Sequence, residues 1–197
     1  MIAPAVAAGV SLVGVGVSNA ATRGPPPAAA ATRANDSAGA HVQQILARYV
    51  RATDHRDGAA LSALLTPQGK VDVSAKNAKG DHQPVGSRIV GRTAIASAVT
   101  ERQSPLGGMR SEHHVTSDPL VEIHGKTAHL NAQFLTYAVH GAAEPAIGWP
   151  AGTTGAQGVI KPFEAGYYDL TLQRAGSGWQ ISHLRVLHDL PIALPQG

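Results

Sequence analysis

Two adjacent histidines, His113 and His114, are the residues of this sequence best suited to acid–base chemistry. They lie near the start of Ser111–Val139, whose pattern predicts two long antiparallel strands joined near His124-Gly125-Lys126. Neighbouring side chains of a strand point to opposite faces of the sheet, so one histidine should face the interior. A neutral imidazole held there can act as a general base. What stands opposite the inward histidine therefore decides what the segment can do.

Several other kinds of site lack the residues they need. The chain has 10 histidines but no HExxH or His-x-His spacing, and we expect no metal and no cofactor. It has no cysteine, which excludes thiolate sites, and no GxSxG elbow of a serine hydrolase. The 16 Lys and Arg residues are scattered without a run of five, so we expect no nucleic-acid partner.

The elements that must position the histidines are predicted from hydrophobic periodicity. A first helix should begin near Ser37 or Ala40 and end around Asp54-His55-Arg56, with a second, shorter helix capped by Asp57. Further predicted elements are a short strand over 71–74, a helix over 91–102, and strands over 166–173 and 179–188. A connection over 140–165, rich in glycine and proline, has the length of a lid or binding loop. This order predicts an α+β fold, with a curved antiparallel sheet forming a cone and helices packed across its concave face.

The N-terminal region divides into two segments before this domain, which we place at 41–190. Residues 1–20 resemble a signal peptide, because an apolar run precedes Ser18-Asn19-Ala20, although no positive charge precedes the run. The run is too short for a stable membrane span. Residues 21–40 are rich in proline and alanine and predict a disordered linker. We expect export to the periplasm or medium if the segment is a signal peptide, and a cytoplasmic protein otherwise.

The chain resembles the SnoaL-like group of the nuclear transport factor 2-like (NTF2-like) superfamily. Four segments carry the resemblance: 45–65, 89–99, 113–137 and 166–186, the first being ILARYVRATDHRDGAALSALL. The resemblance covers most of 42–188 and implies the cone fold, a pocket for a small molecule, and a homodimer formed through the exposed sheet face. It is specific for the fold and less so for function, because the superfamily contains both enzymes and inert modules.

The resemblance also implies site residues. Asp54 and His113 match the aspartate and histidine that act together in scytalone dehydratase-like members. A second histidine of those members is replaced by Gln133, and two tyrosines by Thr53 and Val73. Tyr49 matches a tyrosine of steroid isomerase-like members.

The strand pattern adds other candidate pocket residues. Leu130, Ala132 and Phe134 should pack in the core, whereas Gln133 and Tyr137 on the alternate face could line a partly polar cavity. Tyr168 should lie on the inner side of its strand. His114 takes the place of His113 if the register differs by one residue.

Two hypotheses remain open at this point. The first is a pocket for an apolar, oxygenated ligand of polyketide, steroid or terpenoid type. It would support cofactor-independent lyase, isomerase or cyclase chemistry by the Asp54–His113 pair. The second is a non-catalytic exported module for binding or dimerisation, which the replacements at Val73 and Gln133 favour. In that case Asp54 bonds a loop and His113 is an ordinary strand residue.

Overall fold

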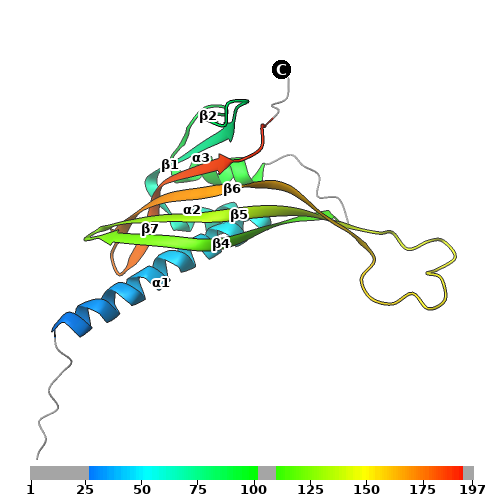
Figure 1. Ribbon diagram of the computed structural model, residues 1–197, viewed down its shortest axis with the longest axis horizontal. Helices are drawn as coiled ribbons and strands as arrows, with labels where there is room; N and C mark the ends of the chain where they lie inside the picture. The colour runs from blue at the N-terminus through cyan, green and yellow to red at the C-terminus, as the bar shows by residue number, and fades with distance from the viewer. Residues whose placement is uncertain (1–26, 102–109, 193–197) are drawn as a thin grey trace, which may run out of the picture.

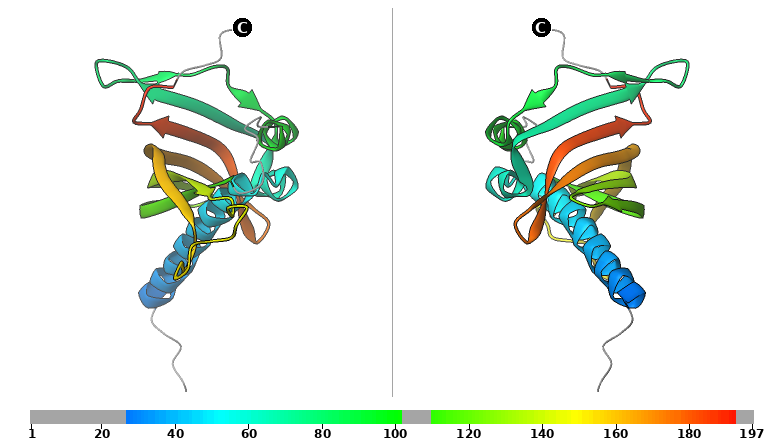
Figure 2. Two further views of the ribbon diagram at one scale, coloured as in Figure 1. Left: turned by 90° about the vertical axis from the view of Figure 1, so that its right-hand side faces the viewer. Right: turned by 90° about the vertical axis from the view of Figure 1, so that its left-hand side faces the viewer.

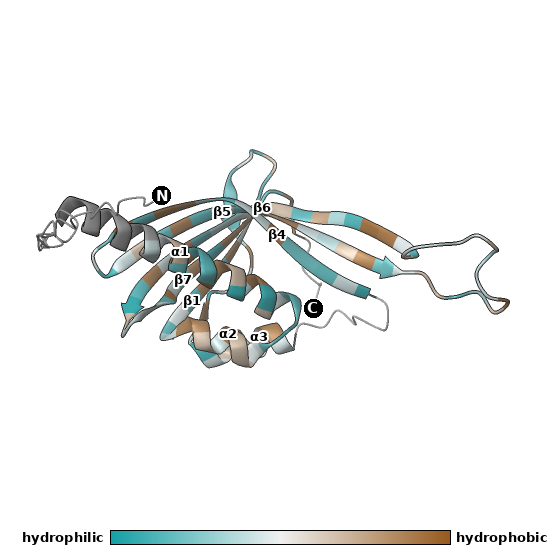
Figure 3. Cartoon of the chain, turned by 90° about the horizontal axis from the view of Figure 1, so that it is seen from below, coloured by the Kyte–Doolittle hydropathy of each residue, from teal (hydrophilic) through white to brown (hydrophobic). Residues whose placement is uncertain are grey.

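The computed structural model describes residues 27–101 and 110–192, without the side chains of residues 27–36. One curved sheet carries the helices on one face, so the fold is the α+β cone that the sequence predicts (Figure 3). The predicted signal-like segment lies outside the described residues. Within them, no helix is long and apolar enough to cross a membrane.

The first helix, α1 (Pro27–Asp54), crosses the sheet diagonally (Figure 1). It begins about ten residues earlier than the sequence predicted, so the second half of the expected linker is helical. Four consecutive alanines follow Pro27, and alanine has the highest helix propensity while proline suits the first helical position. The buried face of α1 carries Val42, Leu46, Tyr49 and Val50, which recur at the spacing of one helix face.

Two short helices complete the helical layer. Helix α2 (Gly58–Leu64) is capped as predicted, because the Asp57 carboxylate accepts a hydrogen bond from the Ala60 backbone N–H at 2.9 Å. Helix α3 (Arg92–Thr100) packs beside α2 and buries Ile95. All three helices lie on the same face of the sheet (Figure 2).

The sheet has the order β2-β1-β7-β6-β5-β4, with β3 also paired to β1. Its strands are β1 (Leu65–Lys76), β2 (His82–Pro84), β3 (Ile89–Val90), β4 (Arg110–His124), β5 (Thr127–Gly141), β6 (Gly158–Ala175) and β7 (Gly178–His188). The pairs from β4 to β7 form the predicted antiparallel meander, whereas β1 runs parallel to β7. The sheet is therefore mixed rather than wholly antiparallel.

The connection predicted over 140–165 is only partly irregular. Strands β5 and β6 continue to pair out to Gly141 and Gly158, so they extend the sheet as a long hairpin. The hairpin and its loop project away from the helices and the body of the cone (Figures 1 and 3).

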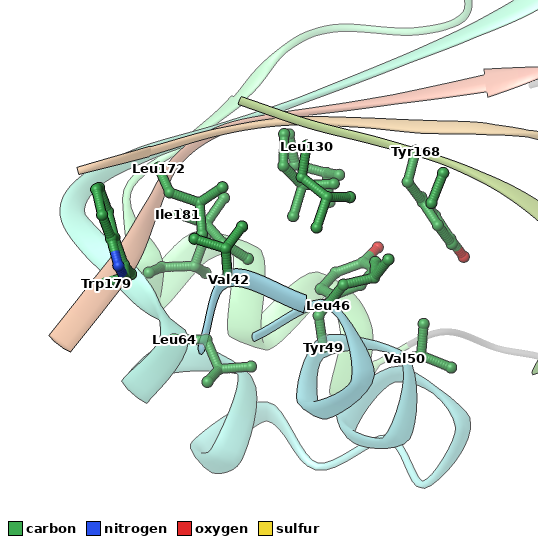
Figure 4. Packing of buried hydrophobic residues seen from close by; sticks show 14 of the residues in the cluster. Val42, Leu46, Tyr49, Val50, Leu64, Leu130, Tyr168, Leu172, Trp179 and Ile181 are labelled. Carbon is green, nitrogen blue, oxygen red and sulfur yellow. The ribbon is translucent and has the colours of Figure 1, made fainter. Parts of the chain in front are cut away.

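The core lies between α1 and the inner face of the sheet (Figure 4). Val42 and Leu46 of α1 meet Leu130 of β5, Leu170 and Leu172 of β6 and Ile181 of β7. Trp179 is buried at the start of β7 and packs in the same core. This layer fixes the end of α1 against β4 and so determines where Asp54 is held.

Candidate functional site

Asp54 is the last residue of α1, and the turn that follows holds it in place. The backbone N–H of Asp57 donates to the carbonyl of Ala52 at 2.8 Å, closing the helix end. Arg56 takes a φ of 54°, a left-handed conformation that turns the chain away from the helix. The Asp54 side chain is thereby directed at β4, the strand that α1 contacts most.

The carboxylate of Asp54 binds one residue of β4 through both its ring and its backbone. His114 Nδ1 lies 2.5 Å from Asp54 Oδ1, and the His114 backbone N–H donates to Oδ1 at 3.2 Å and to Oδ2 at 3.3 Å. The side chain of Asp54 is only 10% exposed, and that of His114 only 7%. A carboxylate only accepts hydrogen bonds, so Nδ1 carries the proton and Nε2 is the basic nitrogen of the neutral ring.

The structure therefore pairs Asp54 with His114 and not with His113, the residue that the resemblance assigned to this position. His113 is exposed, and its ring lies 3.4 Å from the hydroxyl of Ser111. The reason is an extra residue in β4: the pairing with β5 shifts by one between Ser117 and Leu120. Val121 and Ile123 face the core beyond this bulge, but His114 takes the inward position before it.

A signal for this shift was present in the sequence. Asp118-Pro119 stands in the middle of the predicted strand, and proline inside a strand marks an edge or a bulge. Asp118 has a φ of 50° in the structure, so the chain leaves the extended conformation there. Counting alternate residues backward from Val121 across that point assigns the wrong histidine to the interior.

Aromatic rings form the wall next to the Asp54–His114 pair. Phe134 and Tyr168 stack with centroids 4.5 Å apart, and the His114 ring lies 6.3 and 6.4 Å from them. Tyr49 meets Tyr168 edge to face at 5.5 Å (Figure 4). Tyr168 is therefore on the inner side of β6, as predicted, and Tyr49 reaches the same wall from α1.

A hollow of about 350 Å³ opens beside the pair between α1 and β4. Its walls come from Ala47, Val50, Arg51, Asp54 and His55 of the α1 region and from His113, His114 and Thr116 of β4. The hollow therefore adjoins the pair, whose side chains are otherwise almost closed to solvent.

Three predicted binding residues lie away from the pair. Gln133 is exposed, and Tyr137 is opposite His113 in the β4–β5 register, so both belong to the outer face of the sheet. The alternation of β5 was correct, but the helices cover only the Leu130, Ala132 and Phe134 side. Val73 lines a separate hollow with Asp72 and Arg88.

The sequence reasoning missed one residue of the inner face. Thr136 follows Phe134 by two positions and is directly opposite His114 in the β4–β5 register. Its side chain is completely buried, and its hydroxyl has no hydrogen-bond partner among the residues that the structure describes. The alternation of Leu130, Ala132 and Phe134 could have identified it, because the same period places position 136 inside.

A second Asp–His pair lies on the outer face. His183 Nε2 is 2.7 Å from Asp72 Oδ2, and Arg88 binds the same carboxylate with two contacts of 2.7 Å. The hydrogen bonds from Arg88, supported by His183, lower the pKa of Asp72 to about 2. Among the described residues, no three His, Asp or Glu side chains gather as a metal site.

The comparison with known families matches residues 37–185 to the SnoaL-like domain. No protein of curated function matches the chain.

Solved structures share the architecture at low identity. An NTF2-like protein with a cystatin-like fold from Novosphingobium aromaticivorans is 21% identical, with a TM-score of 0.58 over 81% of this chain and 87% of that one. A candidate dehydratase of the NTF2-like family from Streptomyces avermitilis is 15% identical, with a TM-score of 0.54 over 79% and 99%. ActVI-ORFA from Streptomyces coelicolor is 14% identical, with a TM-score of 0.55 over 76% and 96%. Likeness at these identities establishes the fold.

Proposed function

We propose a function from the premise that this chain belongs to the SnoaL-like family of the NTF2-like superfamily. The domain binds an apolar, oxygenated small molecule and catalyses cofactor-independent proton transfer next to a carbonyl group. His114 is the general base, and Asp54 orients it. The observation that carries the proposal is the 2.5 Å contact between His114 Nδ1 and Asp54 Oδ1, two side chains that are almost completely buried.

The proposed step uses the Nε2 atom of His114, the ring nitrogen that does not contact Asp54. Nε2 takes a proton from the carbon next to the carbonyl, a carbon–carbon double bond forms, and the carbonyl oxygen becomes an enolate. If the imidazolium returns the proton to a different carbon of a conjugated enolate, the double bond has moved, which is isomerisation. If the next carbon carries a hydroxyl, that group leaves with a proton from the imidazolium as water, which is dehydration.

The surroundings support an apolar and planar ligand. The rings of Phe134 and Tyr168 lie beside the imidazole, and Tyr49 packs against Tyr168. The similar Streptomyces avermitilis protein is itself a candidate dehydratase, which agrees with this chemistry. Polyketide-, steroid- and terpenoid-like compounds all combine apolar rings with carbonyl groups, so the proposal covers these classes.

Exchange of deuterium into 1-tetralone tests the base directly. We expect the protein in D₂O to accelerate exchange at the carbon next to the carbonyl, measured by proton NMR. His114→Gln should lower this rate by about 100-fold or more, because general-base catalysis typically contributes that much. Asp54→Asn should also lower it, because an amide does not select the same tautomer.

His113→Gln is the matched control, since it removes the same ring from the adjacent residue. The fold-reduction of the exchange rate in His113→Gln should be less than a tenth of the fold-reduction in His114→Gln. Equal rates in the wild type and in His114→Gln would remove the histidine from the reaction. A larger loss in His113→Gln would contradict the pairing seen in the structure.

A second candidate function is dimerisation through the outer face of the sheet. Val115 and Leu120 of β4 are 54% and 71% exposed there, on the side away from the helices. We propose that a second copy of the chain covers them, as the resemblance implies. Analytical ultracentrifugation at micromolar concentration should give the mass of a dimer, and Leu120→Lys should shift it toward the monomer. A wild-type chain that sediments only as a monomer contradicts this second function.

A further inference from the structure

The least explained group of the inner face is the hydroxyl of Thr136. The side chain is 0% exposed, and Oγ1 has no hydrogen-bond partner in the described part of the chain. A buried hydroxyl without a partner costs stability, on the order of its desolvation penalty. Valine has the same shape and suits a β-strand, so packing alone gives no reason for threonine here.

The position of Thr136 relates it to the proposed base. Thr136 is paired with His114 across β4 and β5, and their side chains project from the same face. Directly opposite residues of an antiparallel pair have Cβ atoms roughly 4.5–5.5 Å apart. The two polar side chains are therefore direct neighbours on the inner face of the sheet.

The local backbone also singles out this position. The pairing of β5 with β6 shifts by one residue between Thr136 and Tyr137, next to the threonine. The extra residue is Phe163 of β6, so β5 keeps its alternation here, and bulges are frequent beside active sites. On the same face, Phe134 and Ala138 flank Thr136 and are buried. They offer apolar surroundings in which one hydrogen-bond donor has a large effect on a ligand oxygen.

From these observations we infer that Thr136 binds the carbonyl oxygen of the ligand by donating its hydroxyl proton. This inference rests on the proposed function and adds a specificity residue to the same site. His114 faces the carbon that loses the proton, and Thr136 faces the oxygen that gains negative charge. The preferred ligand class is then an enolisable ketone on an apolar ring system, and the corresponding hydrocarbon is rejected, since it leaves Thr136 unpaired.

The test compares wild type, Thr136→Val and Thr136→Ser, with Thr171→Val as a control on the outer face of β6. Binding of 1-tetralone and of tetralin, its hydrocarbon counterpart, is measured by NMR titration. We expect the wild type to favour the ketone by about ten-fold, the value of one hydrogen bond. Thr136→Val should lose this preference, whereas Thr136→Ser and Thr171→Val should keep it.

Two further measurements separate this role from a purely structural one. The urea midpoint of Thr136→Val should equal or exceed that of the wild type, because a buried unpaired hydroxyl is removed. Its rate of deuterium exchange into 1-tetralone should fall by about 100-fold, as for loss of an oxyanion donor.

The outcomes for Thr136 and His114 are distinguishable. A wild-type protein without preference for the ketone, including one that binds neither compound, overturns the role of Thr136. An unchanged preference in Thr136→Val does the same, whatever the effect of His114→Gln. If Thr136→Val loses the preference but His114→Gln keeps its exchange rate, the binding role of Thr136 stands and the proposed base is wrong.

Discussion

The side chain of Asp54 illustrates how single residues define this site. Its carboxylate contacts both the ring and the backbone N–H of His114, so one side chain holds the imidazole in place. Rotation of the ring away from Asp54 would break the contact between Nδ1 and Oδ1 and leave a buried carboxylate without this partner. Asp54 therefore selects the tautomer and fixes the direction of Nε2 at the same time.

Gly166 has a comparable effect through the side chain that it lacks. It lies between Phe134 and His188 in the registers of β5, β6 and β7, and the rings of those two residues meet edge to face at 5.5 Å. A Cβ at position 166 would lie 1.9 Å from the carbonyl oxygen of Leu187. The close approach of β6 and β7 at this point thus requires glycine.

We expect Gly166→Ala to lower the free energy of unfolding by about 3 kcal/mol, because backbone atoms must move to admit the methyl group. Urea denaturation followed by circular dichroism gives the value. Gly39→Ala is the control, since no atom lies within 4 Å of a Cβ built there in α1. It should raise stability by up to about 1 kcal/mol through helix propensity. Equal stability of Gly166→Ala and the wild type would contradict the close approach of the strands.

The β4 strand shows what the sequence could and could not predict at the scale of elements. Its length, its pairing with β5 and the inward positions of Val121 and Ile123 follow from alternation and agree with the structure. The inward histidine did not follow, because one extra residue at the bulge reverses the alternation between Ser117 and Leu120. The extent of β1 was also missed, since Pro67 and Gly69 look like a turn but lie within the strand.

The left-handed conformation of Asp118 restricts which residues the bulge accepts at this position. A φ of 50° suits glycine, asparagine and aspartate but not a β-branched residue. We expect Asp118→Val to destabilise the fold by about 1–2 kcal/mol and Asp118→Gly to change it by less than about 0.5 kcal/mol. Thermal denaturation of both variants measures the difference. If valine is tolerated as well as glycine, the left-handed conformation at this position is wrong.

The fold of the whole molecule depends on pairings between distant strands, which hydrophobic periodicity does not reveal. The order of helices and the meander from β4 to β7 were predictable, because each adjoining pair is joined by a short connection or carries a clear pattern. The parallel pairing of β1 with β7 was not, since it joins segments more than a hundred residues apart. Asp72 of β1 and His183 of β7 fasten this pairing on the outer face, together with Arg88.

This outer-face cluster predicts how the stability of the fold depends on pH. The pKa of Asp72 is lowered from 3.8 to about 2 in the folded protein, first by the hydrogen bonds from Arg88. The unfolded chain therefore binds the proton more readily, so the contribution of Asp72 is complete above about pH 4 and is lost as the pH falls toward about 2. The carboxylate is partly exposed, and solvent screening reduces that contribution to about 1 kcal/mol.

Asp72→Asn tests the dependence, because asparagine keeps the shape of the side chain without its charge. Urea midpoints should show the variant about 1 kcal/mol less stable than the wild type near neutral pH. The difference should shrink between about pH 4 and pH 2, where the wild-type carboxylate becomes protonated and resembles the amide. Asp57→Asn serves as a control, since it replaces a carboxylate away from the β1–β7 pairing and an asparagine cap preserves the helix. A constant difference across this range would mean that the charge of Asp72 does not fasten β1 to β7.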